Sequence, residues 1–364
     1  MVRITDVRAV TCDVPVPRPI VMGSLRYDTR DYVLVEVVTD EGITGSGFGM
    51  ARYAPVARII ESNLKPLLIG QDPLMTEQLW ERLYYLNLPI SQRGIYMRAL
   101  SVVDVALWDI KGKVAGLPIW KLLGGHRTRI PVLMAGGYVA PDKNVDALAD
   151  EIAGYVSRGF RLIKIAAGTL EEDTARLRAA RRAAGDGPKL MYDAHWAWRD
   201  PHEALRVVRQ WEDLDLAWIE DPFPSELLKP LARFREGTSI PLAIGEDLAG
   251  RWAFQRVLEQ ELVDVVRVDV TNAGGFTEVV KICALAAADG VPVSPHVYPE
   301  IHVHLAAALP NVTHVEMTDP PQGIEALHLL MASTLEVRNG EATAPDRPGL
   351  GVELDPSAVA RYRR

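Results

Sequence analysis

Cysteine is scarce in this chain. Cys12 and Cys283 are the only two among 364 residues, and both lie in apolar runs. Two such residues cannot build the disulfide framework of a secreted protein. The N-terminal MVRITDVRAV alternates like a strand and lacks the apolar core of a signal peptide. We therefore expect a reducing, cytoplasmic location.

Long apolar runs and an excess of positive charge are also absent. The sequence contains no apolar run of about 18 residues, so it predicts no membrane span. A net charge of −8 argues against a surface that follows nucleic-acid phosphates. Hydrophobic residues make up 48% and charged residues 24%, which is typical of a globular protein. The length suits a large domain with a smaller companion.

The first 125 residues differ in pattern from the rest. Three strand-like segments come first, and three amphipathic helical patterns follow them. This order predicts an α+β capping domain over residues 1–125. The glycine-rich segment 45–49 lacks the spacing of a nucleotide-binding loop, and we expect a flexible loop there. The expected strands span residues 4–14, 32–39 and 43–48, and the expected helices 53–69, 73–86 and 93–115.

From residue 126 onward, strand-like and helical patterns alternate strictly. Eight apolar runs separated by helical stretches predict a (β/α)₇β TIM-like barrel over residues 126–320, with a doubly wound sheet as the alternative. Residues 321–364 are irregular and rich in glycine and proline, and we expect them to return to the capping domain. The expected barrel strands lie near residues 131–135, 161–166, 189–194, 216–220, 241–246, 264–269, 291–296 and 313–317.

Six of these strand-like runs end in an acid or a histidine. Neighbouring members of the set are 20 to 27 residues apart, which is about the pitch of one strand-plus-helix unit. A single residue of this kind could be a satisfied core polar group. Six in register predict a ring at the C-terminal mouth of a barrel, where barrel enzymes carry their chemistry. The six are Asp193, Glu220, Glu246, Asp269, His296 and Glu316.

Asp193, Glu220 and Glu246, called the acidic triad below, end three consecutive strands. Their carboxylates should therefore converge and repel one another unless a positive charge lies between them. A donor set of oxygens without cysteine or histidine predicts one hard cation per subunit, Mg²⁺ before Mn²⁺. The alternative is structural ion pairing with lysine or arginine.

Asp269 and His296, called the dyad below, end the next two strands. A carboxylate beside an imidazole fixes its tautomer and raises its basicity, which makes His296 a candidate general base. Glu316, if protonated, could donate a hydrogen bond to a developing oxyanion. Alternatively, Glu316 is the partner of a lysine or arginine beneath the site.

Lys164 and His195 are candidates on the opposite side. Lys164 lies inside the apolar run RLIKIA, so it must face the cavity or a carboxylate. His195 shares a strand face with Asp193 and could project beside the metal. The alternative is a loop histidine stacked on Trp196 or Trp198. A chelating pair at His302 and His304 is disfavoured because the two would lie on nearly opposite faces of a helix.

Taken together, several motifs resemble the enolase superfamily, in its mandelate racemase and muconate lactonizing enzyme branch. They are MYDAH, WIEDP, IGED, VRVDVTNAGG, VSPH and ALWDIKGKVAGLPIWKLLGG. The resemblance covers essentially the whole chain. It implies a capping domain, a (β/α)₇β barrel and a tail that returns to the cap. It also implies Mg²⁺ on the acidic triad, proton abstraction by the dyad, and hydrogen bonding of Glu316 to the substrate carboxylate and enolate.

One departure from this family lies on the second barrel strand. The family usually has Lys-x-Lys there, and the second lysine is the base on the other face of the substrate. This chain has Lys164-Ile165-Ala166, so that base is absent, although Lys164 could still supply positive charge. Asp193-x-His195 instead resembles the galactonate and mannonate dehydratase groups, in which this histidine protonates the departing hydroxide.

The resemblance therefore predicts Mg²⁺-dependent removal of the α-proton of a carboxylate through an ene-diolate. The favoured reaction is dehydration of an acid sugar to a 2-keto-3-deoxy acid. A racemase, epimerase or cycloisomerase on the same scaffold is the first alternative. A metal-binding protein without turnover, in which the missing lysine marks decay, is the second.

We expect specificity to come from cap segments 16–30 and 48–55, which could close over the mouth. Their polar side chains suit hydroxyl groups or a distal carboxylate, and the candidates are Arg18, Arg26, Arg52 and Tyr53. The expected partner is a small acid sugar, with no nucleic acid and no membrane, and we expect a homo-oligomer.

Overall fold

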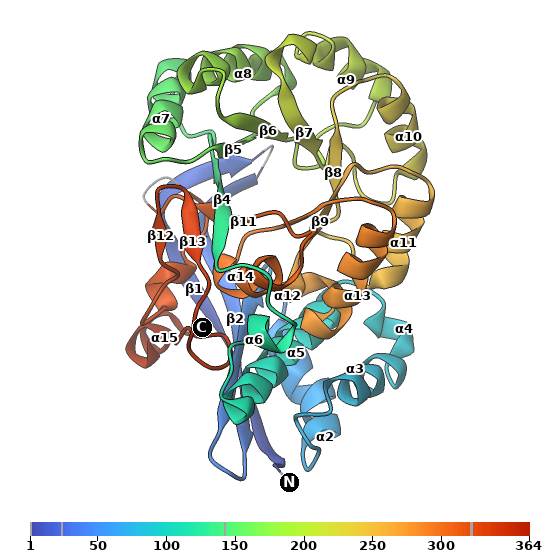
Figure 1. Cartoon of the computed structure of the whole chain (residues 1–364), viewed down its shortest axis with the longest axis vertical. Helices are drawn as coiled ribbons and strands as arrows, with labels where there is room; N and C mark the ends of the chain where they lie inside the picture. Colours follow the sequence, from blue (N-terminus) through green and yellow to red (C-terminus); the bar gives the residue numbers. More distant parts are fainter. Residues whose placement is uncertain (1, 23–24, 142, 321–322) are drawn as a thin grey trace.

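The structure is a computed structural model that describes residues 2–22, 25–141, 143–320 and 323–364 (Figure 1). Its cap begins with an antiparallel sheet of β1 (Ile4–Met22), β2 (Leu25–Thr39) and β3 (Thr44–Met50), in that order. β1 and β2 pair as far as Pro15. After an irregularity, the pairing resumes with Ile20 opposite Tyr27. The segment 16–30 expected as a loop is therefore mostly the far half of a long hairpin, while residues 23–24 lie outside the described residues.

Short helices and one long helix complete the cap. The long helix α5 has most of its residues buried and ends at Gly116, which has a φ of 67°. This agrees with the helix predicted over residues 93–115. The cap helices are α1 (Val56–Ile59), the π-helical turn η1 (Ile60–Leu64), α2 (Lys65–Leu68), α3 (Thr76–Tyr85), α4 (Leu88–Ser91), α5 (Ile95–Ala115) and α6 (Ile119–Leu122).

Glycines in β3 let the sheet approach α5 closely. A Cβ atom at Gly45 would lie 2.1 Å from the Ala106 carbonyl oxygen, and one at Gly47 would lie 2.0 Å from that of Val102. Only glycine fits such an approach of backbone to backbone. The expectation of a flexible loop at residues 45–49 is therefore wrong, because these residues belong to a strand pressed against a buried helix.

Eight parallel strands form the predicted (β/α)₇β barrel. They follow one another from β4 to β10, β11 lies beside β4, and a parallel bridge between Val293 and Val312 joins the two ends of the ring. The strands are β4 (Arg129–Gly136), β5 (Leu162–Ala166), β6 (Lys189–Asp193), β7 (Leu216–Glu220), β8 (Leu242–Ile244), β9 (Val265–Val268), β10 (Val293–Pro295) and β11 (Val315–Thr318).

Helices between these strands surround the barrel (Figure 1). Thr169 caps the N-terminus of α8, because its side chain accepts a hydrogen bond from the backbone N–H of Glu172. The barrel helices are α7 (Val145–Ser157), α8 (Leu170–Ala184), α9 (Pro201–Val208), the 3₁₀ turn η2 (Glu212–Leu214), α10 (Leu228–Glu236), α11 (Arg251–Glu259), α12 (Val270–Ala273), α13 (Gly275–Ala288) and α14 (Pro299–Ala308). Among the described residues, no helix combines the length and apolar character needed to cross a bilayer.

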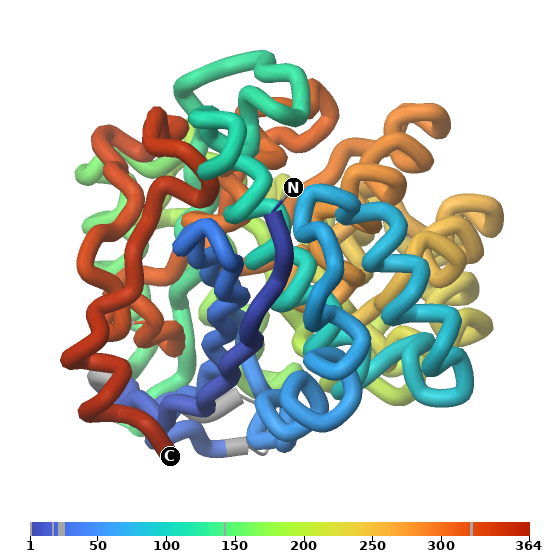
Figure 2. Tube along the Cα trace, turned by 90° about the horizontal axis from the view of Figure 1, so that it is seen from below, coloured from blue at the N-terminus to red at the C-terminus, as the bar shows by residue number. Residues whose placement is uncertain are grey.

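The C-terminal segment lies beside the N-terminal strands (Figure 2). Cys12 and Arg363 form a backbone bridge, and the Arg364 N–H donates to the Thr11 carbonyl. Domain boundaries near residues 125 and 320 stay predictions. The elements of this segment are the 3₁₀ turn η3 (Leu327–Leu330), β12 (Val337–Arg338), β13 (Glu341–Thr343) and α15 (Pro356–Tyr362), and β13 pairs antiparallel with β4.

The contact of β3 with α5 predicts that Gly47→Ala destabilises the protein. The new methyl group would overlap the Val102 carbonyl, so we expect the free energy of unfolding to fall by about 1–3 kcal/mol. Gly187→Ala is the matched control, because a Cβ atom at Gly187 meets nothing within 4 Å. Urea unfolding of both variants measures the difference, and equal stability would contradict the close packing of β3 on α5.

Candidate active site

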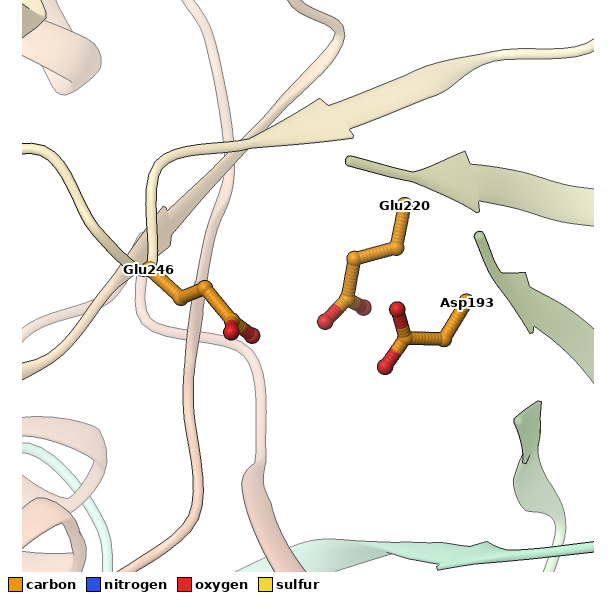
Figure 3. A group of neighbouring side chains, drawn as sticks. All are labelled: Asp193, Glu220 and Glu246. Atoms are coloured by element: carbon orange, nitrogen blue, oxygen red, sulfur yellow. The ribbon is translucent and has the colours of Figure 1, made fainter. Parts of the chain in front are cut away.

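The acidic triad converges at the barrel mouth (Figure 3). Asp193 and Glu220 are the last residues of β6 and β7, and Glu246 lies two residues beyond β8. One carboxylate oxygen from each lies within 4.8 Å of the others, and all three side chains are buried. Within the described ranges, no other three acids, histidines or cysteines come this close.

This geometry fits a hard divalent cation. Three converging carboxylates supply only oxygen donors and leave further positions for water or substrate. Burial, together with repulsion from Asp193 and Glu220, raises the pKa of Glu246 to about 7. A bound cation would remove this electrostatic penalty.

Two buried cations lie beneath the triad. The ammonium group of Lys164, on β5, lies 2.7 Å from Glu220, 3.1 Å from Asp193 and 3.0 Å from Glu316. The guanidinium group of Arg267, on β9, contacts Glu220 at 3.1 Å and Glu316 at 2.6 Å. Glu220 therefore takes part in ion pairs and also belongs to the group of carboxylates that could hold a metal ion.

Sequence reasoning missed Arg267, although the available signal was the same as for Lys164. The residue is a cation inside the apolar run VVRVD, and such a side chain needs a buried carboxylate. Its side chain is completely buried, as is that of Glu220.

Glu316, on β11, differs from the protonated donor considered from the sequence. Although burial alone would raise its pKa, Arg267 and Lys164 lower the pKa well below the ordinary value. The carboxylate is therefore ionised and accepts hydrogen bonds. One oxygen accepts from Arg267, and the other accepts from the backbone N–H of Val297 at 3.3 Å.

The dyad is formed as the sequence spacing suggested. His296 Nδ1 lies 3.1 Å from Asp269 Oδ2, and Thr271 holds the other Asp269 oxygen through its N–H at 2.7 Å and its hydroxyl at 2.8 Å. The second ring nitrogen, Nε2, lies 3.2 Å from Glu246. Although burial lowers the pKa of His296, Glu246 and Asp269 raise it above its ordinary value. The imidazole therefore lies between its orienting carboxylate and the acidic triad.

His195 lies at a sharp turn after β6. Its φ is 48° and that of Trp196 is 54°, which is strained backbone of the kind found at functional sites. Its backbone N–H donates to Asp193 at 3.0 Å, and its ring packs against that of Trp196 at a tilt of 45°, with centroids 4.4 Å apart. Burial lowers the pKa of His195 to about 4, so the imidazole is neutral. The contact with Trp196 fits the interpretation of His195 as a loop histidine, and its projection beside a metal stays a prediction.

The position of the missing lysine is occupied by an apolar cluster. Ala166 is buried together with Ile20 and Tyr27 of the cap hairpin, Tyr138 after β4, and Ile324 of the C-terminal segment. Sequence reasoning missed Tyr138, although it lies two residues beyond a barrel strand, as Glu246 does. Burial raises the pKa of Tyr138, which keeps its phenol protonated. This face of the mouth therefore offers no base at residue 166.

Cap residue Arg52 reaches toward the triad. Arg52 and Tyr53 have φ values of 54° and 58°, and the Tyr53 N–H donates to Asp31 at 2.6 Å. This turn places the Arg52 guanidinium 3.7 Å from Glu246. The Tyr53 hydroxyl instead donates to the Thr29 carbonyl, and the side chain is half exposed.

Arg18 and Arg26 lie on the cap hairpin. Arg18, on β1, is partly buried, and its positive charge contributes to a lowered pKa of Lys143, for which burial is the larger cause. Arg26, on β2, is exposed and pairs with Asp28 at 2.8 Å. In the described part of the chain, no contact of Arg26 is with the triad or the dyad. Substrate binding by these two residues stays a prediction.

Sequence models of two protein domains match this chain. Residues 5–124 match the mandelate racemase / muconate lactonizing enzyme N-terminal domain, and residues 147–358 match the enolase C-terminal domain-like family. The chain belongs to the mandelate racemase and muconate lactonizing enzyme family. The resemblance inferred from the motifs is thereby confirmed.

Members of this family with established activities match nearly the whole chain. Arabinonate dehydratase of Saccharolobus solfataricus is 35% identical over 92% of this chain and 91% of its own length. D-galactarolactone cycloisomerase of Agrobacterium fabrum is 36% identical over 99% of each. A racemase from Streptomyces coelicolor, solved with bound magnesium, has a TM-score of 0.92 and is 30% identical over 99% of this chain and 100% of its own.

The triad geometry predicts that Glu246→Gln weakens Mg²⁺ binding. Glu246 makes no ion pair with Lys164 or Arg267 among the described residues, so this substitution alters the metal site without disturbing that network. We expect affinity for Mg²⁺ to fall about tenfold or more. Titration calorimetry measures it, with Asp104→Asn, at a buried cap carboxyl, as the control. Undiminished affinity in Glu246→Gln would remove this residue from the site.

Proposed function

We propose that this chain is a Mg²⁺-dependent lyase that dehydrates an acid sugar to a 2-keto-3-deoxy acid. The observation that carries the proposal is the placement of His296 between Asp269 and the acidic triad, while Ala166, at the position of the usual second base, lies in an apolar cluster. This arrangement supplies one base next to one cation site. The names of relatives, among them arabinonate dehydratase, support the substrate class.

The acidic triad would hold the cation. A bound Mg²⁺ supplies positive charge that stabilises an ene-diolate. Lys164 adds a second positive charge beside the triad. Glu316, ionised between Lys164 and Arg267, fixes the positions of both cations.

His296 is the proposed base. Its Nδ1–H donates to Asp269, which leaves Nε2 to accept the α-proton from the triad side. The Asp269 carboxylate then stabilises the imidazolium ion that forms. Breaking the α-C–H bond leaves its electron pair on the substrate as an ene-diolate.

Departure of the 3-hydroxyl group completes the reaction. The electron pair of the ene-diolate forms the new C=C bond, and the C–O bond breaks. His195 donates a hydrogen bond to the departing oxygen, since a neutral imidazole carries one N–H donor. The proton held by His296 converts the hydroxide to water, and the enol product tautomerises to the 2-keto acid. No second base is needed.

Arg52 is the proposed contact for the polar far end of the substrate. Its guanidinium group approaches from the cap and, among the described residues, has a single ionic contact, at 3.7 Å. Guanidinium groups suit both hydroxyl and carboxylate oxygens. A cytoplasmic location and a homo-oligomeric state stay predictions.

Cycloisomerisation is the second candidate. D-galactarolactone cycloisomerase aligns over 99% of both chains, which favours it as strongly as sequence identity favours dehydration. Both reactions begin with removal of an α-proton, so the dyad serves either. They differ in the product, because a cycloisomerase rearranges its substrate without releasing water.

The first test combines His296→Asn with a screen of acid sugars in deuterated water containing Mg²⁺. The native enzyme should exchange the substrate α-proton and form a 2-keto acid. His296→Asn should lose both activities by at least about 100-fold, because the base is gone. His202→Asn, at an exposed histidine, is the control. Full exchange in His296→Asn would identify a different base, with Lys164 and His195 as the candidates.

The second test separates proton removal from loss of the hydroxyl group. His195→Asn should slow formation of the 2-keto acid by about 10- to 100-fold, while α-proton exchange by His296 continues. Proton NMR of the same reaction follows both quantities. If active substrates return only an epimer or a rearranged lactone in the native enzyme, dehydration is wrong and the isomerase takes its place.

A further inference from the structure

We propose that His302 is a positioning residue that sets the geometry of the Asp269–His296 dyad by joining the backbones of the two loops that carry it. The inference rests on the proposed role of the dyad in proton abstraction. His302 does not touch the reacting atoms in this proposal. It acts through the residues that directly follow Asp269 and His296.

The contacts of His302 reach both loops. The residue lies on α14, and its side chain is completely buried. Its Nε2 accepts a hydrogen bond from the Val270 N–H at 3.0 Å, and its Nδ1 lies 2.6 Å from the Val297 carbonyl oxygen. A backbone N–H can only donate and a carbonyl can only accept. The ring is therefore neutral and carries its proton on Nδ1.

The first of these bonds determines what the Asp269 carboxylate can do. Val270 begins α12, where backbone N–H groups lack partners within the helix. One Asp269 oxygen already accepts the Thr271 N–H and hydroxyl. Because His302 accepts the Val270 N–H, that donor does not compete for the other oxygen. Asp269 Oδ2 is thus left for His296.

The second bond holds a strained turn. Val297 and Tyr298, directly after His296, have φ values of 41° and 43°. This conformation is unfavourable for a β-branched residue and persists only where neighbours enforce it. His302 binds the Val297 carbonyl, while Glu316 accepts the Val297 N–H at 3.3 Å. The turn that aims His296 is therefore held from both sides.

His304 provides a matched control on the same helix. It is also fully buried, and it also makes one accepting and one donating bond to backbone groups. Its Nδ1 accepts from the Trp120 N–H at 3.2 Å, and its Nε2 lies 3.0 Å from the Leu350 carbonyl oxygen. These partners lie on the cap and the C-terminal segment, so loss of His304 should cost stability without disturbing the dyad.

The kinetic test compares His302→Leu with His304→Leu. Both should lower the unfolding temperature, because each leaves two buried backbone groups unpaired. Only His302→Leu should reduce kcat for α-proton exchange, by about 10- to 100-fold, as expected for a misplaced base. KM and Mg²⁺ affinity should stay within about twofold of the native values. His302→Gln, which keeps one acceptor and one donor, should fold better and recover part of kcat.

A spectroscopic readout keeps this test independent of the proposed function. In ¹⁵N-histidine-labelled protein, His302 should show the Nδ1–H tautomer and His304 the Nε2–H tautomer. His302→Leu and His302→Gln should shift the Nδ1–H resonance of His296, and His304→Leu should not. If the native protein turns over no acid sugar, the proposed function fails while this comparison still decides the role of His302. An unshifted His296 resonance in both His302 variants, or equal kcat in His302→Leu and His304→Leu, would overturn the inference.

Discussion

Repulsion among buried carboxylates at the barrel mouth is the constraint on which the site depends. Asp193, Glu220 and Glu246 come within 4.8 Å of one another because three adjacent parallel strands end at the same edge. Lys164 and Arg267 neutralise the part of this charge nearest the barrel interior. Glu246 forms no ion pair with either cation among the described residues, and burial, together with repulsion from Asp193 and Glu220, raises its pKa. Both the proposed cation site and the contact with His296 involve Glu246, the triad carboxylate that Lys164 and Arg267 do not pair with.

The cap completes the site by controlling which face of the mouth carries charge. Ile20 and Tyr27 of its long hairpin cluster with Ala166 and make that part of the mouth apolar, whereas the turn at Arg52 brings a guanidinium group to Glu246. The hairpin is in turn joined to the C-terminal segment, because Glu325 accepts hydrogen bonds from Arg30 and Tyr32. The position of the cap hairpin therefore depends on a chain segment some 300 residues away in sequence.

The positions of residues that recur at a regular spacing in the sequence could be predicted, whereas those of residues that depend on tertiary contacts could not. Barrel strands and ring residues repeat at the pitch of a strand–helix unit, so the barrel and the converging triad could be inferred from spacing alone. The full length of β1 and β2 could not, because pairing beyond Pro15 depends on a partner strand rather than on alternation. Gly47 was expected to be flexible, but a glycine is needed there because the Val102 carbonyl lies too close for a side chain. Val102 belongs to a helix far along the chain, so local sequence does not reveal this contact. The role of Arg267 depends in the same way on Glu220 and Glu316.

A single base next to a single cation site restricts the chemistry to reactions that begin with removal of an α-proton. It does not determine whether dehydration or cycloisomerisation follows. In the proposed mechanism, removal of the α-proton by His296 gives the same ene-diolate whether a hydroxyl group or a lactone oxygen then leaves, so the dyad would not distinguish the two reactions. Two-base epimerisation needs a second residue that returns a proton to the other face of the substrate. The apolar cluster around Ala166 argues against such a residue at that position. What leaves must then be decided by groups on the triad side. His195, tied to Asp193 through its backbone, and Arg52, aimed from the cap, are the described side chains placed to decide it.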